Sequence, residues 1–169
     1  MCINNFAYIG IGSNIGVQIN KIDTALELID QDYKCSVDLV SSIYESKPYG
    51  ESDQENFFNA VCKISTYYEP LELFYFLKKV EEQVGRTKTV KWGPREIDLD
   101  ILFYNNVVYS DKQLTIPHKD ILNRDFVLVP LCEIAGDLLH PLLDKKICDL
   151  NTLNCQKHII RKIPHKVLV

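Results

Sequence analysis

The order of the apolar segments is the feature that most limits the folds open to this chain. Short β-rich runs occupy 6–11, 37–44, 57–67 and 97–104, and apolar residues recur at helical spacing over 19–33 and 69–84. The order is strand, helix, strand, strand, helix, strand, which is typical of an antiparallel sheet with packed helices. We therefore expect an α+β fold with a ferredoxin-like βαββαβ core, helices on the sheet faces and extra C-terminal elements.

The second helix has the clearest boundaries. Pro70 stands at its first position, Leu73 and Leu77 lie on one apolar face, and Gly85 marks its end. Further along, Asn105 and Asn106 predict a hairpin turn into a strand at 107–109, and a third helix is expected over 123–135. No linker or repeat divides the chain, so we expect a single domain over 1–169.

Charge and hydropathy exclude several classes of protein. The chain has 19 Lys and Arg against 23 Asp and Glu, a net charge of −4, which argues against nucleic acid as a partner. No apolar stretch approaches the roughly 20 residues that span a bilayer, and the first residues do not resemble a signal peptide. We therefore expect a cytoplasmic protein that does not bind membranes. The six cysteines lack metal-binding spacing and are expected to be free thiols.

Two carboxylates mark the last predicted strand of the core. Asp98 and Asp100 alternate with Ile97, Leu99 and Ile101, so both acids point to one side, about 7 Å apart. Unpaired carboxylates are costly to bury on a sheet face, so something positive must face them. Alone, the pair is compatible with a solvated face or with a site for divalent cations.

Basic residues cluster near these acids in an otherwise acidic chain. Arg86, Lys88, Lys91 and Arg95 lie within twelve residues of Asp98, and guanidinium groups suit phosphate oxygens. The chain has no G-x-x-x-x-G-K-[ST] loop, and Gly10-x-Gly12 is a weak nucleotide motif. The spacing favours phosphoryl transfer without a standard phosphate loop.

Two further clusters combine polar and aromatic side chains. His118 is followed by Arg124 and Phe126, which add a group suited to phosphate and a ring. On another strand Phe57 and Asn59 share one face. Core packing explains such rings as well, but an amide in register with a ring suits the edge of a planar heterocycle.

Taken together, these motifs closely resemble the 6-hydroxymethyl-7,8-dihydropterin pyrophosphokinase family. The resemblance covers essentially the first 140 residues and is carried by Ala7-Tyr-Ile-Gly-Ile-Gly-Ser-Asn14, Ser42-Ile-Tyr44, Phe58-Asn-Ala60, Lys91-Trp-Gly-Pro-Arg-Glu-Ile-Asp-Leu-Asp100, Leu114-Thr-Ile-Pro-His118 and Arg124-Asp-Phe-Val-Leu-Val-Pro-Leu131. It implies transfer of pyrophosphate from ATP to the pterin hydroxymethyl group, with release of AMP, in folate biosynthesis. It also implies a monomer that could associate with neighbouring folate enzymes.

The resemblance assigns roles residue by residue. Asp98 and Asp100 would hold two Mg²⁺ ions and, with Arg86 and Arg95, form the catalytic set. The residues expected at ATP are Glu81, Arg86, Trp92, Arg95, Ile101, Thr115, His118 and Arg124. Those expected at the pterin are Pro48, Tyr49, Phe57, Asn59, Trp92 and Phe126. Loops at 45–54 and 85–92 would close over the substrates.

Three positions depart from the family pattern, one of them Lys119, which occupies a position that is often Tyr or Pro. Phe57 stands where tyrosine is common, so stacking is retained without a hydroxyl contact, and Tyr49 replaces a usual aliphatic residue. Two alternatives stay open at this level. A ferredoxin-like module could bind nucleotide or another small molecule without turnover, and a sheet with exposed aromatic rings could bind RNA. Release of AMP would distinguish the enzyme from both of these binding proteins.

Overall fold

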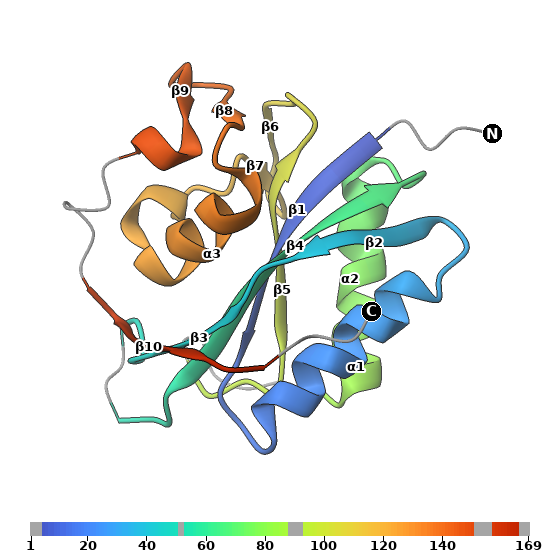
Figure 1. Ribbon diagram of the computed structural model, residues 1–169. Helices are drawn as coiled ribbons and strands as arrows, with labels where there is room; N and C mark the ends of the chain where they lie inside the picture. Colours follow the sequence, from blue (N-terminus) through green and yellow to red (C-terminus); the bar gives the residue numbers. More distant parts are fainter. Residues whose placement is uncertain (1–4, 51–52, 88–92, 151–156, 166–169) are drawn as a thin grey trace.

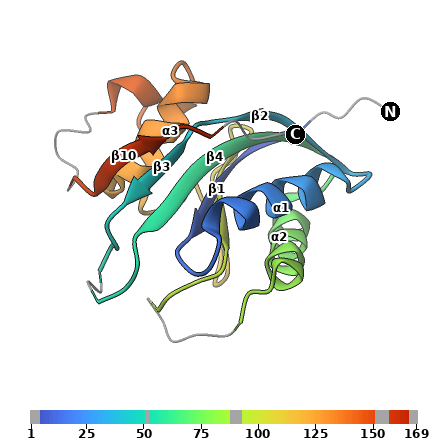
Figure 2. The same ribbon diagram turned by 60° about the horizontal axis from the view of Figure 1, so that its bottom comes forward.

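An antiparallel sheet with helices on both faces forms the centre of the molecule. The computed structural model describes residues 5–50, 53–87, 93–150 and 157–165. The main sheet has the order β10-β3-β4-β1-β5, with β2 also paired to β4. Helices α1 and α2 lie against one face and α3 against the other (Figures 1 and 2). The expectation of an antiparallel sheet with packed helices is confirmed.

The described elements up to β5 follow the predicted order, except that the second predicted strand is divided in two. The helices are α1 (Gln18–Asp30), α2 (Pro70–Val84) and α3 (Asp125–Ala135), with short 3-10 turns η1 (Ile121–Asn123) and η2 (Ile147–Asp149). The strands are β1 (Asn5–Ser13), β2 (Cys35–Val40), β3 (Ile43–Ser46), β4 (Phe57–Thr66), β5 (Asp98–Tyr104), β6 (Tyr109–Ser110), β7 (Thr115–Ile116), β8 (Leu139–His140), β9 (Lys145–Lys146) and β10 (Ile159–Ile163).

Helix α2 begins and ends for local reasons. Glu69 and Glu72 form a reciprocal capping box at its start, and Pro70 occupies the first turn, where its missing N–H is not needed. Gly85 ends the helix with a φ of 102°, a left-handed conformation that glycine adopts without strain. The predicted boundaries of this helix are therefore confirmed.

Two hydrophobic clusters flank the sheet. Leu26 of α1 and Leu77 of α2 pack with Ile9 and Leu99 on one side. On the other side, Leu128 and Leu131 of α3 pack with strand residues that include Val61 and Leu102. Because alternate residues of a strand point to opposite faces, one sheet can serve both clusters. On the sheet face that α3 covers, a pocket lies between β5 and the start of α3, and polar side chains such as Asp98 and Asp100 line it.

The second predicted strand is divided. The pattern predicts one strand over 37–44, whereas the structure breaks it between Val40 and Ile43. At the break the Ser42 N–H donates to Glu133 of helix α3 at 3.2 Å, and the Val61 N–H donates to the Ser41 hydroxyl at 2.9 Å. These side chains take backbone groups away from the ladder, so β2 and β3 pair with β4 as separate strands.

The expected hairpin after β5 is wrong in its pairing. A turn does form at Asn105 and Asn106, with Asn105 at a φ of 45°. The chain then leaves β5, and β6 pairs with β7 instead, matching Tyr109 to Ile116. Asn105 is tied to β1 rather than to a returning strand, because its side chain accepts the Phe6 N–H at 2.9 Å.

The expectation of six free thiols is also wrong. Cys132 of α3 and Cys148 of η2 form a disulfide, while Cys35 and Cys62 are buried free thiols. The turn η2 packs on α3, and the Cys148 N–H donates to the Gly136 carbonyl at 3.1 Å. This packing brings the two Cα atoms to 5.3 Å, a separation that a disulfide can bridge. Cys2 and Cys155 lie outside the described residues.

Within the described ranges, no helix combines the length and apolar character needed to cross a bilayer.

Candidate active site

A row of three residues across three strands organises the site. Gly12 of β1 pairs with Asn59 of β4 on one side and with Asp98 of β5 on the other. Residues directly opposite one another in antiparallel strands share a face, so the amide and the carboxylate project from the same face. Two strand spacings separate them, roughly 9 to 10 Å. Between them the sheet presents only a glycine.

Glycines make an open floor for this pocket. Gly10 and Gly12 both line it, with Asp98 and Asp100 along one side. A Cβ atom at position 12 would lie 3.4 Å from Asn59 Oδ1 and 3.9 Å from the Phe57 ring. A side chain at this position would therefore occupy space between the amide and the ring. The motif Gly10-x-Gly12 acts here by leaving space beside β5, without the loop of a phosphate-binding motif.

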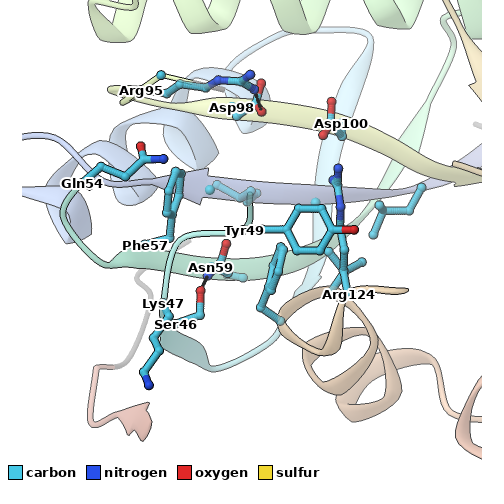
Figure 3. A pocket seen from close by; sticks show the side chains of 18 residues that line it. Ser46, Lys47, Tyr49, Gln54, Phe57, Asn59, Arg95, Asp98, Asp100 and Arg124 are labelled. Carbon is cyan, nitrogen blue, oxygen red and sulfur yellow. Dashed lines mark hydrogen bonds and ion pairs between the residues drawn. The ribbon is translucent and has the colours of Figure 1, made fainter. Parts of the chain in front are cut away.

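Asp98 is held between two arginines. The Arg86 Nη1 donates to Asp98 Oδ1 at 2.7 Å. On the other carboxylate oxygen, Arg95 Nη1 forms a short contact with Oδ2, which Figure 3 shows. Arg86 also contacts Glu81 of helix α2. Glu81 is only 2% exposed. Its carboxylate accepts a hydrogen bond from the Leu99 N–H at 2.8 Å and forms an ion pair with Lys78 at 2.6 Å. Glu81 thus anchors Arg86 from within the fold and does not line the pocket.

The two aspartates differ in their titration. Burial raises the pKa of Asp98, but the charges of Arg95 and Arg86 outweigh burial and lower it below the ordinary range. Burial and then the charge of Asp98 raise the pKa of Asp100. The His118 Nε2 lies 4.0 Å from Asp100 Oδ2 and offsets this in part. The negative charge of Asp98 is therefore balanced by two arginines, whereas the ionised form of Asp100 would be stabilised by an added cation.

His118 faces Asp100 in a defined orientation. Its backbone N–H donates to the Leu102 carbonyl at 3.0 Å, and its Nδ1 accepts the Asp120 N–H at 3.2 Å. In the neutral ring the proton then sits on Nε2, the atom that faces Asp100. Burial lowers the pKa of His118 despite the opposing charge of Asp100. His118 can thus donate a hydrogen bond toward the carboxylate side of the pocket.

The opposite side of the pocket is aromatic. Phe57, Tyr49 and Phe126 line it together with Asn59, whose Nδ2 donates to the Ser46 hydroxyl at 2.8 Å (Figure 3). The rings of Tyr49 and Phe126 meet edge to face, with centroids 6.0 Å apart. Flat apolar walls beside a buried amide suit a planar, polar-edged ligand. This confirms that Phe57 and Asn59 face the same way.

Arg124 connects the aromatic side to the carboxylate side. It precedes α3, points toward Asp100 (Figure 3), and its guanidinium lies 5.3 Å from the centre of the Tyr49 ring. One nitrogen pairs with Asp120 at 3.0 Å. The Nε atom is buried and has no hydrogen-bond partner within the part of the chain that the structure describes. A buried donor of this kind is suited to an anionic ligand.

The polar groups also limit how a metal could bind. Among the described residues, no three His, Cys, Asp or Glu side chains are grouped so that they could hold a metal ion. Asp98 and Asp100 would therefore need oxygen ligands from water or from a bound substrate. This is how Mg²⁺ commonly binds, with one or two carboxylates and the phosphates of a nucleotide. The donor set fits Mg²⁺ in the presence of a phosphate ligand.

The structure brings only some of the predicted site residues to the pocket. Those that line it are Tyr49, Phe57, Asn59, Arg95, Asp98, Asp100, Arg124 and Phe126. Arg86 and His118 contact its carboxylates from outside. Pro48 and Thr115 do not line it, and Ile101, 3% exposed, lies in the core beneath the sheet. Trp92, Lys88 and Lys91 lie outside the described residues.

Several residues of the site were missed by sequence reasoning. Leu102 lines the pocket, and extending the alternation of Asp98 and Asp100 by two residues would have predicted it. Gln54 and Lys47 also line it; both belong to the loop 45–54 that the resemblance expects to close over the substrates, but a turn-rich segment has no periodicity that could single them out. His158 packs against two of the lining rings from the far end of the chain.

Comparison with protein-family models finds one family. The model described as "7,8-dihydro-6-hydroxymethylpterin-pyrophosphokinase (HPPK)" matches residues 8–136. A 2-amino-4-hydroxy-6-hydroxymethyldihydropteridine pyrophosphokinase of Haemophilus influenzae is 45% identical over 135 residues, covering 80% of this chain and 84% of the relative. The Aquifex aeolicus protein of the same name is 41% identical over 150 residues, covering 89% of this chain and 92% of its own length.

Solved structures share the fold at low sequence identity. A Plasmodium falciparum HPPK-DHPS A437G crystal structure with SDX-DHP aligns with a TM-score of 0.71 at 17% identity, covering 86% of this chain. The aligned part is 44% of that longer chain. At this identity the comparison supports the fold alone. It agrees with a mixed α and β domain built on an antiparallel sheet.

Proposed function

The chain belongs to the 7,8-dihydro-6-hydroxymethylpterin-pyrophosphokinase family, and we propose that the pocket beside β5 is its active site. The family assignment makes the protein an ATP-dependent pyrophosphokinase of folate biosynthesis, which transfers pyrophosphate from ATP to the hydroxymethyl group of 6-hydroxymethyl-7,8-dihydropterin. This assignment decides for an enzyme over the alternative of a non-catalytic binding module. We further propose that residues 1–169 act as one domain with a ferredoxin-like core, for which the order β5-β1-β4, followed by β2 and β3 each paired to β4, is the support.

The row of Asn59, Gly12 and Asp98 is the observation that carries the proposed site. A bicyclic ring held at Asn59 between Phe57 and Phe126 would lie over Gly12. Its side arm would then reach across the second strand spacing to Asp98. The glycine floor supports this placement, because any larger residue would fill the space between the two ends. Tyr49 and, by resemblance, Pro48 and Trp92 would complete the pterin side.

We place the nucleotide phosphates on the carboxylate side. Arg86, Arg95 and Arg124 would contact phosphate oxygens, and His118 would donate from Nε2. Asp98 and Asp100 would hold two Mg²⁺ ions, which when bound neutralise charge on the transferring group. Thr115 and the strand backbone at Ile101 are proposed for the adenine side. Glu81 supports ATP binding through Arg86.

Cation binding at Asp98 would require its two arginines to exchange their ion-pair partner. Asp98 is paired with Arg86 and Arg95, and the same two carboxylate oxygens are the donors that Asp98 would offer to a bound cation. The two guanidinium groups would then be free to turn to phosphate. Because one set of charges replaces another, the exchange avoids leaving any buried charge unpaired.

The reaction balances without a further reactant. The pterin hydroxyl oxygen forms a bond to the β-phosphorus of ATP, and the bond from that phosphorus to the oxygen bridging to the α-phosphate breaks. AMP leaves with that oxygen, and the hydroxyl loses its proton. We propose that Asp98 relays that proton to water, because it lies at the end of the row toward which the side arm reaches and its lowered pKa disfavours keeping the proton. The arginines and His118 stabilise the charge on the transferring group.

An assay of AMP release tests the function. Purified protein, ATP, Mg²⁺ and 6-hydroxymethyl-7,8-dihydropterin should yield AMP and pterin pyrophosphate in equal amounts. Omission of the pterin should stop AMP release. Asp137→Asn, at a highly exposed carboxylate far from the pocket, serves as a control that should retain activity. Release of ADP, or of AMP without pterin, would contradict the proposal.

A further inference from the structure

The C-terminal strand reaches the aromatic side of the pocket. The matched family region ends at residue 136, whereas β10 begins at Ile159 and pairs with β3, next to the pocket-lining Ser46 and Lys47. Figure 2 shows β10 at the edge of the sheet, beside β3 and near α3. Residues outside the matched region are thus placed beside the proposed pterin subsite.

His158, just before β10, packs on the two rings of that side. Its ring centroid lies 5.4 Å from that of Tyr49 and 5.8 Å from that of Phe126, both in edge-to-face geometry. Tyr49 and Phe126 are themselves in contact, so the three rings form a closed triangle. Two of its members line the pocket, and the His158 side chain, 11% exposed, backs them.

Asp125 fixes the position of His158. This residue is 6% exposed at the first turn of α3, and its Oδ2 accepts the N–H groups of His158 and Ile159 at 2.8 and 3.0 Å. Its Oδ1 accepts the Phe126 N–H at 2.8 Å and lies 3.5 Å from His158 Nδ1. One buried carboxylate therefore joins the start of α3, which carries Phe126, to the start of β10.

A second tie connects His158 to the loop that carries Tyr49. The Lys47 N–H donates to the His158 carbonyl at 2.9 Å. His158 is thus held both to the segment before Tyr49 and to the helix that begins beside Phe126. Both rings depend on the same residue for their relative position, although they lie on separate segments.

We propose that His158 is a positioning residue for the pterin subsite, holding Tyr49 and Phe126 as a preformed wall against which the heterocycle stacks. The inference rests on the proposed function of the pocket. Without His158 the two rings would retain their contact with each other but lose the common support behind them. Preorganisation of this kind acts on the affinity for the ligand that meets the wall, and it should leave the distant phosphate side unchanged.

Titration of a His158→Ala variant tests this. Calorimetry should give a pterin Kd raised about 10-fold, as expected when two ring contacts are lost, with the Kd of a non-hydrolysable ATP analogue within about 2-fold of wild type. The KM for pterin should rise with kcat little changed. His158→Phe keeps an aromatic ring and should restore pterin affinity to within about 3-fold of wild type.

The chain supplies a matched control. His165 follows β10 and pairs with Asp23 of α1 at 3.0 Å, away from the pocket. His165→Ala removes a histidine paired with an aspartate from the same segment, and its pterin Kd should match that of wild type. If His158→Ala does not fold, His158→Gln takes its place, because glutamine keeps the bulk without the ring.

The outcomes separate the two levels of the proposal. Unchanged pterin affinity in His158→Ala, or an equal loss of affinity for pterin and the ATP analogue, would overturn the role of His158. Phe126→Ala in the same titration tests the pocket itself. If that variant weakens pterin binding and His158→Ala does not, only the role of His158 is rejected. If neither weakens pterin binding, the assignment of the pocket is rejected as well.

Discussion

Arg86 donates to Asp98 across 2.7 Å, so the residue proposed for phosphate and the residue proposed for metal neutralise each other. Asp98 has a second guanidinium partner in Arg95, whereas Asp100 faces His118 at 4.0 Å. The two carboxylates lie on one strand and on one face, yet they are not equivalent. This difference allows their variants to be told apart by stability as well as by activity.

The two aspartate variants should lose activity alike and differ in stability. Asp98→Asn and Asp100→Asn should each lower AMP release at least about 100-fold, because each removes a proposed metal ligand. Asp98→Asn removes the charge that pairs with Arg95 and one of the two carboxylates that pair with Arg86, and it should lower the melting temperature. Burial and Asp98 raise the pKa of Asp100, so its ionised form is disfavoured in the folded protein at neutral pH. Asp100→Asn should therefore melt at or above the wild-type temperature in buffer without divalent cations. Near wild-type turnover of Asp100→Asn would contradict the metal site.

Substitution of Arg95 should act on catalysis more than on binding of the pterin. Arg95→Ala removes a guanidinium group from the carboxylate side of the pocket, where charge develops on the transferring group. We expect kcat to fall about 100-fold or more, with the pterin Kd changed less than about 3-fold. Steady-state kinetics and calorimetry would measure the two. Equal, small effects on all parameters would instead indicate a solvated basic side chain.

Phe126 should behave as a ligand contact and not as a core residue. Phe126→Ala removes one ring of the wall and should weaken pterin binding about 10- to 100-fold, with ATP affinity retained and little loss of stability. Leu131→Ala on the same helix is the control, because Leu131 is fully buried and its truncation should lower the free energy of unfolding by about 2 to 5 kcal/mol. A large melting shift in Phe126→Ala with unaltered pterin affinity would show it to be core.

Gly12 offers a test of the pocket floor that adds one methyl group. The new Cβ in Gly12→Ala would stand 3.4 Å from Asn59 Oδ1, an ordinary contact, so the fold should tolerate it with a melting temperature close to that of wild type. The methyl group would occupy the floor over which the pterin is proposed to lie. We expect the pterin Kd to rise at least about 10-fold, since overpacking a closed contact costs about 1 to 3 kcal/mol. Unchanged affinity would show that the ligand does not cross Gly12.

Stability should fall in mildly acidic solution through His140. Burial lowers the pKa of His140 below 6.5, against the opposing effect of a backbone hydrogen bond. The unfolded chain then binds more protons than the folded chain once the pH falls below 6.5, so stability is complete above that pH and declines beneath it. Urea unfolding at about pH 7.5 and about pH 5.5 should show this decline, and His140→Phe should reduce it. An equal decline in the variant would assign the effect to other groups.

Local pattern determined the elements and the direction of their side chains. The ends of α2 follow from Pro70 and Gly85, and the shared face of Asp98 and Asp100 follows from alternation along one strand. The same reasoning placed Phe57 with Asn59. These features depend on residues a few positions apart, where backbone geometry has a fixed period. Resemblance to known motifs then supplied the reaction.

Only the tertiary structure decided what these faces meet. Asn59, Gly12 and Asp98 form one row because three strands pair in a particular register, and that register depends on packing of the whole sheet. The division between β2 and β3 depends on Glu133 of a distant helix. Asp125 and His158 join segments 33 residues apart without any periodic signal. Contacts between remote segments are set by how the layers pack, which no local spacing encodes.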